Sequence, residues 1–218
     1  MDTYKTEQEQ LEALKKWWET NGKFVLVLLV VTFTASIGWR VWSNHENSTL
    51  ESASLEYNAV ISNLRSEEAD AALRNGAGLI EKRGDTSYAV LAALAMAKLE
   101  VEKGELDTAS QRLSWAVEHA EIPEVIHIAR IRLARVLLAL GKFDEALAQA
   151  SVDVAGGFDA AYAMVKGDVY AQRGLADQAK TAYNTALNTS FEMSATSKNL
   201  LQMKLDNLGG ANLSVSPE

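Results

Sequence analysis

One apolar run near the N-terminus contains sixteen consecutive residues without a charge, from Phe24 to Trp39. As a helix, this run would span roughly 24 Å at about 1.5 Å per residue. A helix that crosses the ~30 Å hydrocarbon core of a bilayer usually has about 17 to 25 residues. Continuing the helix to Trp42 supplies that length, because Arg40 is close enough to the end for its guanidinium to reach the lipid headgroups. We therefore predict a single membrane-spanning anchor over residues 24–42.

Tryptophans lie on both sides of this run. Trp17 and Trp18 precede it, and Trp39 and Trp42 close it with Arg40 between them. Tryptophan is enriched where a span meets the membrane–water interface, because its ring is apolar and its N–H group is polar. We expect the four tryptophans and Arg40 to lie at the membrane interfaces.

Lysine and arginine are distributed unequally around the anchor. The N-terminal flank contains Lys5, Lys15, Lys16 and Lys23, whereas no lysine or arginine occurs between Trp42 and Arg65. The positive-inside bias then places residues 1–23 in the cytoplasm and the large C-terminal part across the membrane. Within that tail, a face formed by Leu11, Leu14, Trp17 and Trp18 predicts an amphipathic juxtamembrane helix.

A cleaved signal peptide is the alternative to an anchor. Its apolar region would be residues 24–33, and its cleavage site would be Thr34-Ala35-Ser36. The segment in front would be unusually long and acidic for a signal peptide, and the aromatic residues around Arg40 would have no purpose. The pattern favours the anchor.

Beyond residue 50, apolar residues recur at three- and four-residue spacing and no stretch alternates with period two, which predicts an all-α domain. Gly104, Gly141 and Gly174 each follow a segment of helix length, at spacings of 37 and 33 residues. Small residues recur seven positions before and five positions after these glycines: Ala97, Ala134, Gly167, Ala109, Ala146 and Ala179. A period near 34 residues, with small residues where two helices must approach closely, is typical of tetratricopeptide repeats.

The predicted domain limits follow from this register. Residues 43–50 are polar and are expected to form a linker, and residues 51–210 an α-solenoid of about four helical hairpins. Matching the degenerate first hairpin to the register on small residues selects Ala59, Ser66, Ala71 and Gly78. A final helix from Ser194 to Leu208 is expected to cap the last repeat, and residues 211–218 to be disordered.

Composition narrows the possible functions. The chain has no cysteine, which excludes disulfides, zinc–thiolate sites and thiol catalysis and suits an oxidising compartment. Residues 1–42 hold five basic and five acidic residues, so the net charge of −8 belongs to the large C-terminal part. An acidic domain gives no electrostatic reason to bind nucleic acid. His45, His119 and His127 have no metal-ligand spacing, and no catalytic motif occurs. We expect no enzyme activity, no cofactor, no metal and no small-molecule substrate.

In tetratricopeptide stacks, the first helix of each hairpin lines the concave face. A mostly apolar groove with a few charges on this face suits an extended or helical apolar segment. Burial of several of these residues under neighbouring helices is the equally supported alternative. The repeat register selects ten candidate protein-binding residues: Leu91, Leu94, Lys98, Val101, Ile128, Ile131, Arg135, Leu138, Met164 and Asp168.

Ordered pieces along nearly the whole chain resemble the YfgM family, the single-pass ancillary subunits of the bacterial Sec translocon. They begin with an acidic tail led by Tyr4 and the amphipathic stretch LEALKKWWETNGK at residues 11–23. The further pieces are Gly38-Trp39-Arg40-Val41-Trp42, Ser52-Ala53-Ser54-Leu55-Glu56-Tyr57, Ile131-Arg132-Leu133-Ala134-Arg135-Val136 and Leu201-Gln202-Met203-Lys204-Leu205-Asp206-Asn207-Leu208. The resemblance implies a bacterial inner-membrane protein with a periplasmic repeat domain. It also implies partnership with the SecYEG translocon and a PpiD-like membrane-anchored periplasmic chaperone, and help in passing exported, unfolded polypeptides to other chaperones. It assigns no catalytic residue.

The sequence is compatible with two functional hypotheses, which belong to different classes of protein. The first is the translocon-associated chaperone-network subunit, and the second is a membrane-anchored scaffold for another envelope complex. An enzyme without a recognisable motif is the weakest third. Binding of unfolded polypeptides would separate the first from the second, because a scaffold should bind only a folded partner.

Overall fold

The computed structural model describes residues 7–152, 157–189 and 194–210. It divides into two compact units, Met1–Ser52 and Ala53–Glu218. The described residues form helices and no strand, which confirms the all-α prediction; the tail at 211–218 lies outside the described residues. The helices are α1 (Glu7–Arg65), α2 (Ala69–Arg83), α3 (Ser87–Glu102), α4 (Leu106–His119), α5 (Pro123–Ala139), α6 (Phe143–Ala150), α7 (Asp159–Gln172), α8 (Ala176–Thr189) and α9 (Ala195–Gly210).

The first unit consists of the N-terminal part of α1. The segment Glu9–Arg40 is long and apolar enough to cross a membrane, judged by length and composition. Its large apolar side chains are exposed, as lipid-facing side chains would be, with Phe24 at 83% and Phe33 at 70%. The hydroxyls of Thr32, Thr34 and Ser36 donate to carbonyl oxygens four residues earlier. The polar groups of this apolar stretch are thereby satisfied within the helix itself.

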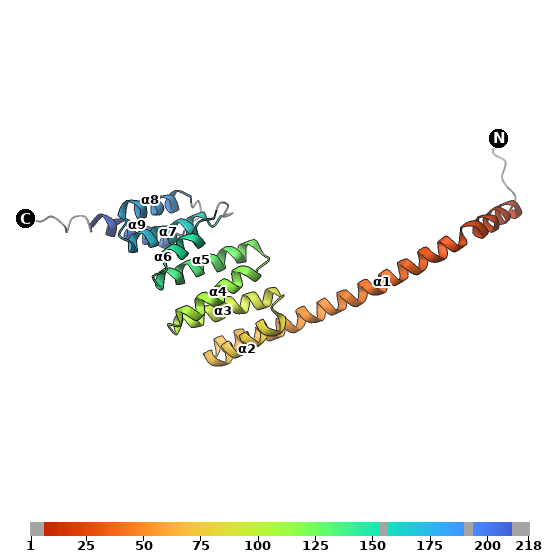
Figure 1. Ribbon diagram of the computed structural model, residues 1–218, viewed down its shortest axis with the longest axis horizontal. Coiled ribbons are helices and arrows are strands. Elements are labelled where there is room, and N and C mark those ends of the chain that lie inside the picture. The colour runs from red at the N-terminus through yellow and green to blue at the C-terminus, as the bar shows by residue number, and fades with distance from the viewer. Residues whose placement is uncertain (1–6, 153–156, 190–193, 211–218) are drawn as a thin grey trace, which may run out of the picture. The chain divides into compact units, whose positions relative to one another are not determined.

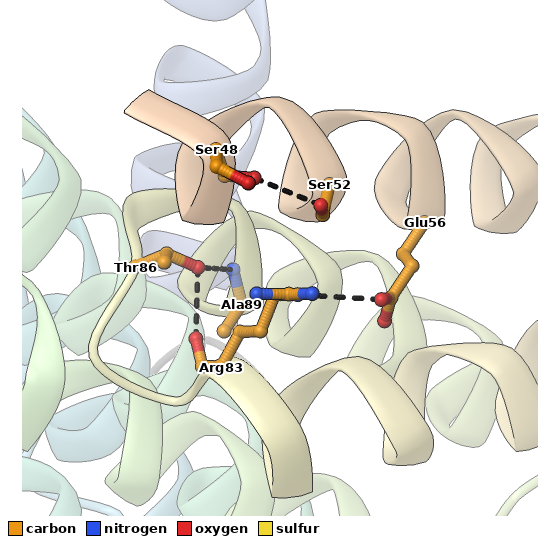
Figure 2. A network of polar contacts seen from close by, with 6 residues as sticks. All are labelled: Ser48, Ser52, Glu56, Arg83, Thr86 and Ala89. Carbon is orange, nitrogen blue, oxygen red and sulfur yellow. Dashed lines mark hydrogen bonds and ion pairs between the residues drawn. The ribbon is translucent and has the colours of Figure 1, made fainter. Parts of the chain in front are cut away.

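Residues 43–50 are helical, whereas the sequence predicted a linker at this position. The stretch contains neither proline nor glycine, so nothing in it stops a helix. The helix runs on past the stretch, and the Ser52 hydroxyl donates to the Ser48 carbonyl oxygen at 2.8 Å (Figure 2). The unit boundary, after Ser52, nevertheless falls close to the predicted start of the repeats.

The second unit is a stack of hairpins in chain order. Figure 1 shows α2 to α8 following one another through the stack, and α9 packs against α8. In the first hairpin, Ala53 of α1 shares a core cluster with Leu79 of α2, and Glu56 of α1 is ion-paired with Arg83 of α2. The following hairpins are α3–α4, α5–α6 and α7–α8. Four hairpins and a capping helix are what the glycine spacing predicted.

The three spaced glycines end the first helices of their hairpins. Gly104, Gly141 and Gly174 have φ angles of +79°, +74° and +75°. In each case the glycine N–H donates to a carbonyl three residues earlier, and the next N–H donates to one five residues earlier. This is the Schellman arrangement, in which a residue in the left-handed region satisfies the last carbonyls of a helix. Glycine is favoured there because it has no β-carbon.

The first hairpin uses the same turn without glycine. Glu67 has a φ angle of +60°, and the N–H of Glu68 donates to the Asn63 carbonyl at 2.9 Å. Glu67 is therefore the counterpart of the three glycines, and the register matched on Ser66 was wrong by one residue. The residue at this turn is large and its neighbour Ser66 is small, so side-chain size does not mark the turn here. The register built on Glu67 places Val60, Ala72 and Leu79 in the core, and all three are fully buried.

Small residues allow the paired helices to approach closely. Ala109, Ala134, Ala146 and Ala179 are completely buried and Ala97 nearly so. Gly167 faces the ring of Tyr183, which lies where a β-carbon would be. The sequence argument for close helix packing at these positions is confirmed.

A few polar contacts hold successive helices together. The Thr86 hydroxyl caps α3 by accepting from the Ala89 N–H, and Arg83 forms an ion pair with Glu56 at 3.3 Å (Figure 2). Between α3 and α4, the Arg112 guanidinium binds Oε1 of Glu100 at 2.8 Å. Glu100 is 2% exposed, so this carboxylate is a buried charge that depends on Arg112.

Candidate functional site

A groove lies between the first helices of the second and third hairpins. It encloses about 360 Å³. Its floor is apolar and its edges carry charged side chains. We call it the charged groove; it is lined by Leu94, Ala97, Lys98, Val101, Glu102, Leu113, Arg132, Arg135 and Val136.

The edges of the charged groove are predominantly positive. Lys98 lies 3.6 Å from Glu102 in an exposed ion pair along α3. Arg132 and Arg135 are exposed on α5, and among the described residues neither forms an ion pair. Two guanidinium groups on one edge can bind carboxylates with bidentate geometry. The groove therefore combines an apolar floor with free cationic donors.

A second, smaller depression lies at the N-terminal ends of α3 and α5. We call it the apolar hollow; it encloses about 40 Å³ and is lined by Ser87, Val90, Leu91, Ala120, Glu121, Ile122 and Val125. Ile122, in the turn before α5, is 47% exposed. An exposed isoleucine beside an apolar depression offers contact area for an apolar side chain of a partner.

The ten residues predicted to line an open groove fall into three classes. Lys98, Val101, Ile128 and Arg135 are exposed, and Leu91, Met164 and Asp168 are partly buried. Leu94, Ile131 and Leu138 are 6–7% exposed, so these three belong to the core, as in the alternative that neighbouring helices cover them. Leu94 nonetheless reaches the floor of the charged groove. The role of the ten residues in protein binding stays a prediction.

Packing between first helices explains this division. Helix α5 contacts α7 directly, and Ile131 and Leu138 belong to a core cluster that also contains Val165 of α7. Between α3 and α5 the charged groove remains, and Val101 keeps 40% of its surface exposed. The repeat register places all these residues on one face, but the spacing of neighbouring helices determines which of them are accessible.

Asp168 is not part of an open groove. Its Oδ1 accepts from the Tyr183 hydroxyl at 2.7 Å and from the ammonium of Lys204 on α9. Burial, and then the hydrogen bond to Asp168, raise the pKa of Tyr183. Met164 packs against a core cluster that contains Tyr183 of α8 and Leu201 of α9. The capping helix therefore closes this end of the face.

Several residues of the two depressions were not among the predicted ten. Arg132 lies one turn before Arg135 on α5, and Ile122 and Val125 come from the turn and first turn of that helix. The signal that could have identified Arg132 is its three-residue spacing from Arg135, which places two cations on adjacent turns of one helix. Nothing in the repeat register marks Ile122.

The predicted membrane-interface residues belong to the first unit. Trp17, Trp18, Trp39 and Trp42 are 50–69% exposed, and Arg40 is exposed as well. The rings of Trp39 and Trp42 meet edge to face at 5.5 Å. Residues 7–23 are helical and continuous with the span. Their location at a membrane interface stays a prediction.

The described histidines participate in packing. Nδ1 of His127 lies 2.9 Å from the Tyr162 hydroxyl, and its ring stacks on Phe158. His119 stacks on Trp115 with ring centroids 4.2 Å apart. Within residues 7–152, 157–189 and 194–210, no group of histidine and acidic side chains has the geometry to hold a metal ion.

Comparison with known proteins covers nearly the entire chain. A family profile described as "Tetratricopeptide repeat-like domain" matches residues 15–210. This chain is 31% identical to a protein named "Ancillary SecYEG translocon subunit" from Aggregatibacter actinomycetemcomitans and 29% identical to the protein of that name from Haemophilus influenzae. Each match covers 93% of this chain and 97% of the relative. The protein of that name from Escherichia coli is 27% identical over 95% of this chain and 99% of its own. The chain therefore belongs to the YfgM family, as a non-enzymatic protein with a tetratricopeptide-repeat-like domain.

Proposed function

We propose that this chain is a membrane-anchored ancillary subunit of a SecYEG translocon. The observation that carries the proposal is the extent of the similarity to proteins of that name, at 27–31% identity over 93–95% of this chain. The similarity includes the apolar segment of α1 as well as the repeats. A shared anchor and a shared repeat domain support a shared place of action at the membrane.

The proposed topology follows from charge. The four lysines before the apolar segment favour a cytoplasmic N-terminus, so the repeats lie in the periplasm of the bacterial inner membrane. The absence of cysteine from the sequence suits that oxidising compartment. It also makes the topology simple to test, because any cysteine introduced by mutation is the sole reactive thiol.

The proposed partners are the translocon, a PpiD-like membrane-anchored chaperone and unfolded exported polypeptides. A stack of helical hairpins offers an extended surface for polypeptide segments, and the charged groove supplies an apolar floor for their side chains. We propose that the subunit holds its chaperone partner beside the translocation channel and helps to pass emerging polypeptides to the periplasmic chaperones. A scaffold for another envelope complex is the alternative.

Co-purification with site-specific crosslinking tests the function. Photo-crosslinking amino acids at Val101 and Ile128 report on the exposed first-helix face, and one at Gln111 on α4 serves as the matched control. Translocon subunits in a mild-detergent eluate, with chaperone or polypeptide adducts from Val101 and Ile128 alone, are the expected result. A different envelope complex without translocon subunits would reassign the protein to scaffolding.

Cysteine labelling tests the topology. Single cysteines at Gln10 and at Ser114 lie on opposite sides of the proposed span. A membrane-impermeant maleimide added to cells with a permeabilised outer membrane should label the Ser114→Cys variant and leave the Gln10→Cys variant unlabelled. The reverse pattern would show the opposite orientation, and labelling of a shortened product would show cleavage of the apolar segment.

A further inference from the structure

Two depressions of different character lie along the same two helices. The apolar hollow is formed by the N-terminal ends of α3 and α5, and the charged groove lies further along both helices. Leu91 of the apolar hollow and Lys98 of the charged groove are seven residues apart on α3, which corresponds to about 10 Å along a helix. One extended segment of a few residues can therefore contact both depressions at once.

The charges along this surface are polarised. At the end with the apolar hollow, the ionisable lining residue is Glu121. At the other end, Lys98, Arg132 and Arg135 line the charged groove, and its one acidic side chain, Glu102, is already paired with Lys98. This cationic edge belongs to a chain whose net charge is −8, so it is a local exception to the overall charge. Acidic groups of a partner are attracted to one end and repelled from the other.

The cationic edge does not extend to the fourth hairpin. The position of α7 that corresponds to Lys98 and Arg135 in the repeat register is Asp168, and its charge is neutralised by Lys204. The recognition surface is therefore confined to α3 and α5. A confined surface with two distinct ends can select both the composition and the direction of a bound segment.

We propose that this surface recognises a polypeptide segment in which apolar side chains stand next to acidic ones. The apolar side chains lie over Leu91 and Ile122 of the apolar hollow and over Ile128, which is exposed on α5 one turn before Arg132. The acidic side chains bind Arg132 and Arg135. This inference specifies the type of segment bound by the surface that the proposed function assigns to partners, and it rests on that function. It predicts that basic apolar segments bind more weakly than acidic ones.

Peptide binding to the full-length protein in lipid nanodiscs tests the inference. The probes are two fluorescent peptides with the same apolar run, one followed by glutamates and the other by lysines. Exposed ion pairs are individually weak, so a glutamate peptide that pairs with both Arg132 and Arg135 should bind roughly tenfold more tightly than the lysine peptide at low salt. The preference should shrink as salt is added, because exposed charges are screened.

Variants assign the effect to this surface. Arg132→Glu with Arg135→Glu should reverse the preference between the two peptides, and Ile128→Ser should weaken both peptides to a similar degree. Lys198→Glu, on the exposed surface of α9, is the control for a charge reversal away from this surface and should leave both affinities unchanged. Equal affinity of the wild-type protein for the two peptides, or an unaltered preference in the double variant, would overturn the inference.

Two further readouts separate the possible failures. A photo-crosslinker at Val101 that joins two copies of this chain would show that a second copy occupies the surface, and would also overturn the inference. Co-purification of translocon subunits is measured on the same preparations. If it persists while the peptides show no preference, the inference fails and the proposed function stands; if it is absent from the wild-type protein, the proposed function fails.

Discussion

Gly167 and Tyr183 pack so closely that the tyrosine ring occupies the space of a β-carbon on the glycine. Gly167 lies on α7 and Tyr183 on α8, so the contact sets how closely the two helices of the fourth hairpin approach. At the far end of the same ring, the Tyr183 hydroxyl donates a hydrogen bond to Asp168. Tyr183 thereby connects close helix packing to the polar contact that α9 makes through Lys204.

Replacement of Gly167 by alanine should destabilise the repeat domain by about 1–3 kcal/mol, because the new methyl group overlaps the ring of Tyr183. The measurement is urea unfolding of the full-length protein in mild detergent, followed by circular dichroism. Gly78→Ala is the matched control, because nothing lies within 4 Å of a β-carbon at that helical position. The control should gain about 0.5–1 kcal/mol from the higher helix propensity of alanine. Equal effects of the two substitutions would contradict the close contact.

Replacement of Glu67 by glycine should stabilise the protein by about 0.5–1 kcal/mol, because a residue with a β-carbon is strained at the positive φ of this turn. The converse substitution, Gly141→Ala, should cost about 1 kcal/mol at the equivalent turn of the third hairpin. Thermal unfolding of both variants provides the measurement. A loss of stability on Glu67→Gly would show that the first turn does not adopt the Schellman arrangement in solution.

Removal of Arg112 should be strongly destabilising. The Arg112→Met variant leaves the buried Glu100 carboxylate without its ion pair, and breaking a buried pair in this way typically costs about 3–5 kcal/mol. Oε2 of Glu100 already lacks a hydrogen-bond partner, so no other group replaces the lost contact. The double variant Glu100→Leu with Arg112→Met should recover most of the stability, as measured by a double-mutant cycle. Additive losses in the double variant would argue against the pairing.

The stability of the protein should fall in alkaline solution partly through Tyr183. Burial and the hydrogen bond to Asp168 raise the pKa of Tyr183 above its ordinary value of about 10. The folded state then keeps the phenol proton at a pH where the unfolded chain releases it. The resulting stabilisation is fully present below about pH 10 and is lost as the pH rises through the raised pKa.

The Tyr183→Phe variant provides the measurement for this pH dependence. Urea midpoints between about pH 9 and 11 should fall less steeply for the variant than for the wild-type protein, because its phenylalanine has no proton to release. Tyrosinate absorbance should reveal one late-titrating phenol that the variant lacks. Identical alkaline slopes for both proteins would contradict the raised pKa.

Much of the repeat domain could be predicted from the sequence. The spacing of Gly104, Gly141 and Gly174 located three of the turns, because a positive φ angle strongly favours glycine. The small residues at fixed distances from them identified the helix contacts. In the first hairpin the predicted register was one residue off, because Glu67 adopts the same backbone conformation without the glycine that would have marked it.

The sequence predicted which helix faces carry the candidate site better than it predicted which residues of those faces are exposed. Lys98, Val101, Ile128 and Arg135 are exposed as expected, whereas Ile131 and Leu138 are in the core. Periodicity specifies which face of a helix a residue occupies, and it places the exposed and the buried residues of this set on the same face. It carries no information on how closely the next first helix approaches that face.

The sequence by itself therefore determined the apolar segment, the helical repeats and the register of the three hairpins that turn at glycine, because each depends on spacing along one chain. Only the tertiary structure decided that α7 covers α5 while the charged groove remains between α3 and α5. It also decided that Asp168 is bound by Lys204, thirty-six residues further along the chain. These features depend on distances between helices that are remote in sequence, and such distances result from the packing of the whole domain.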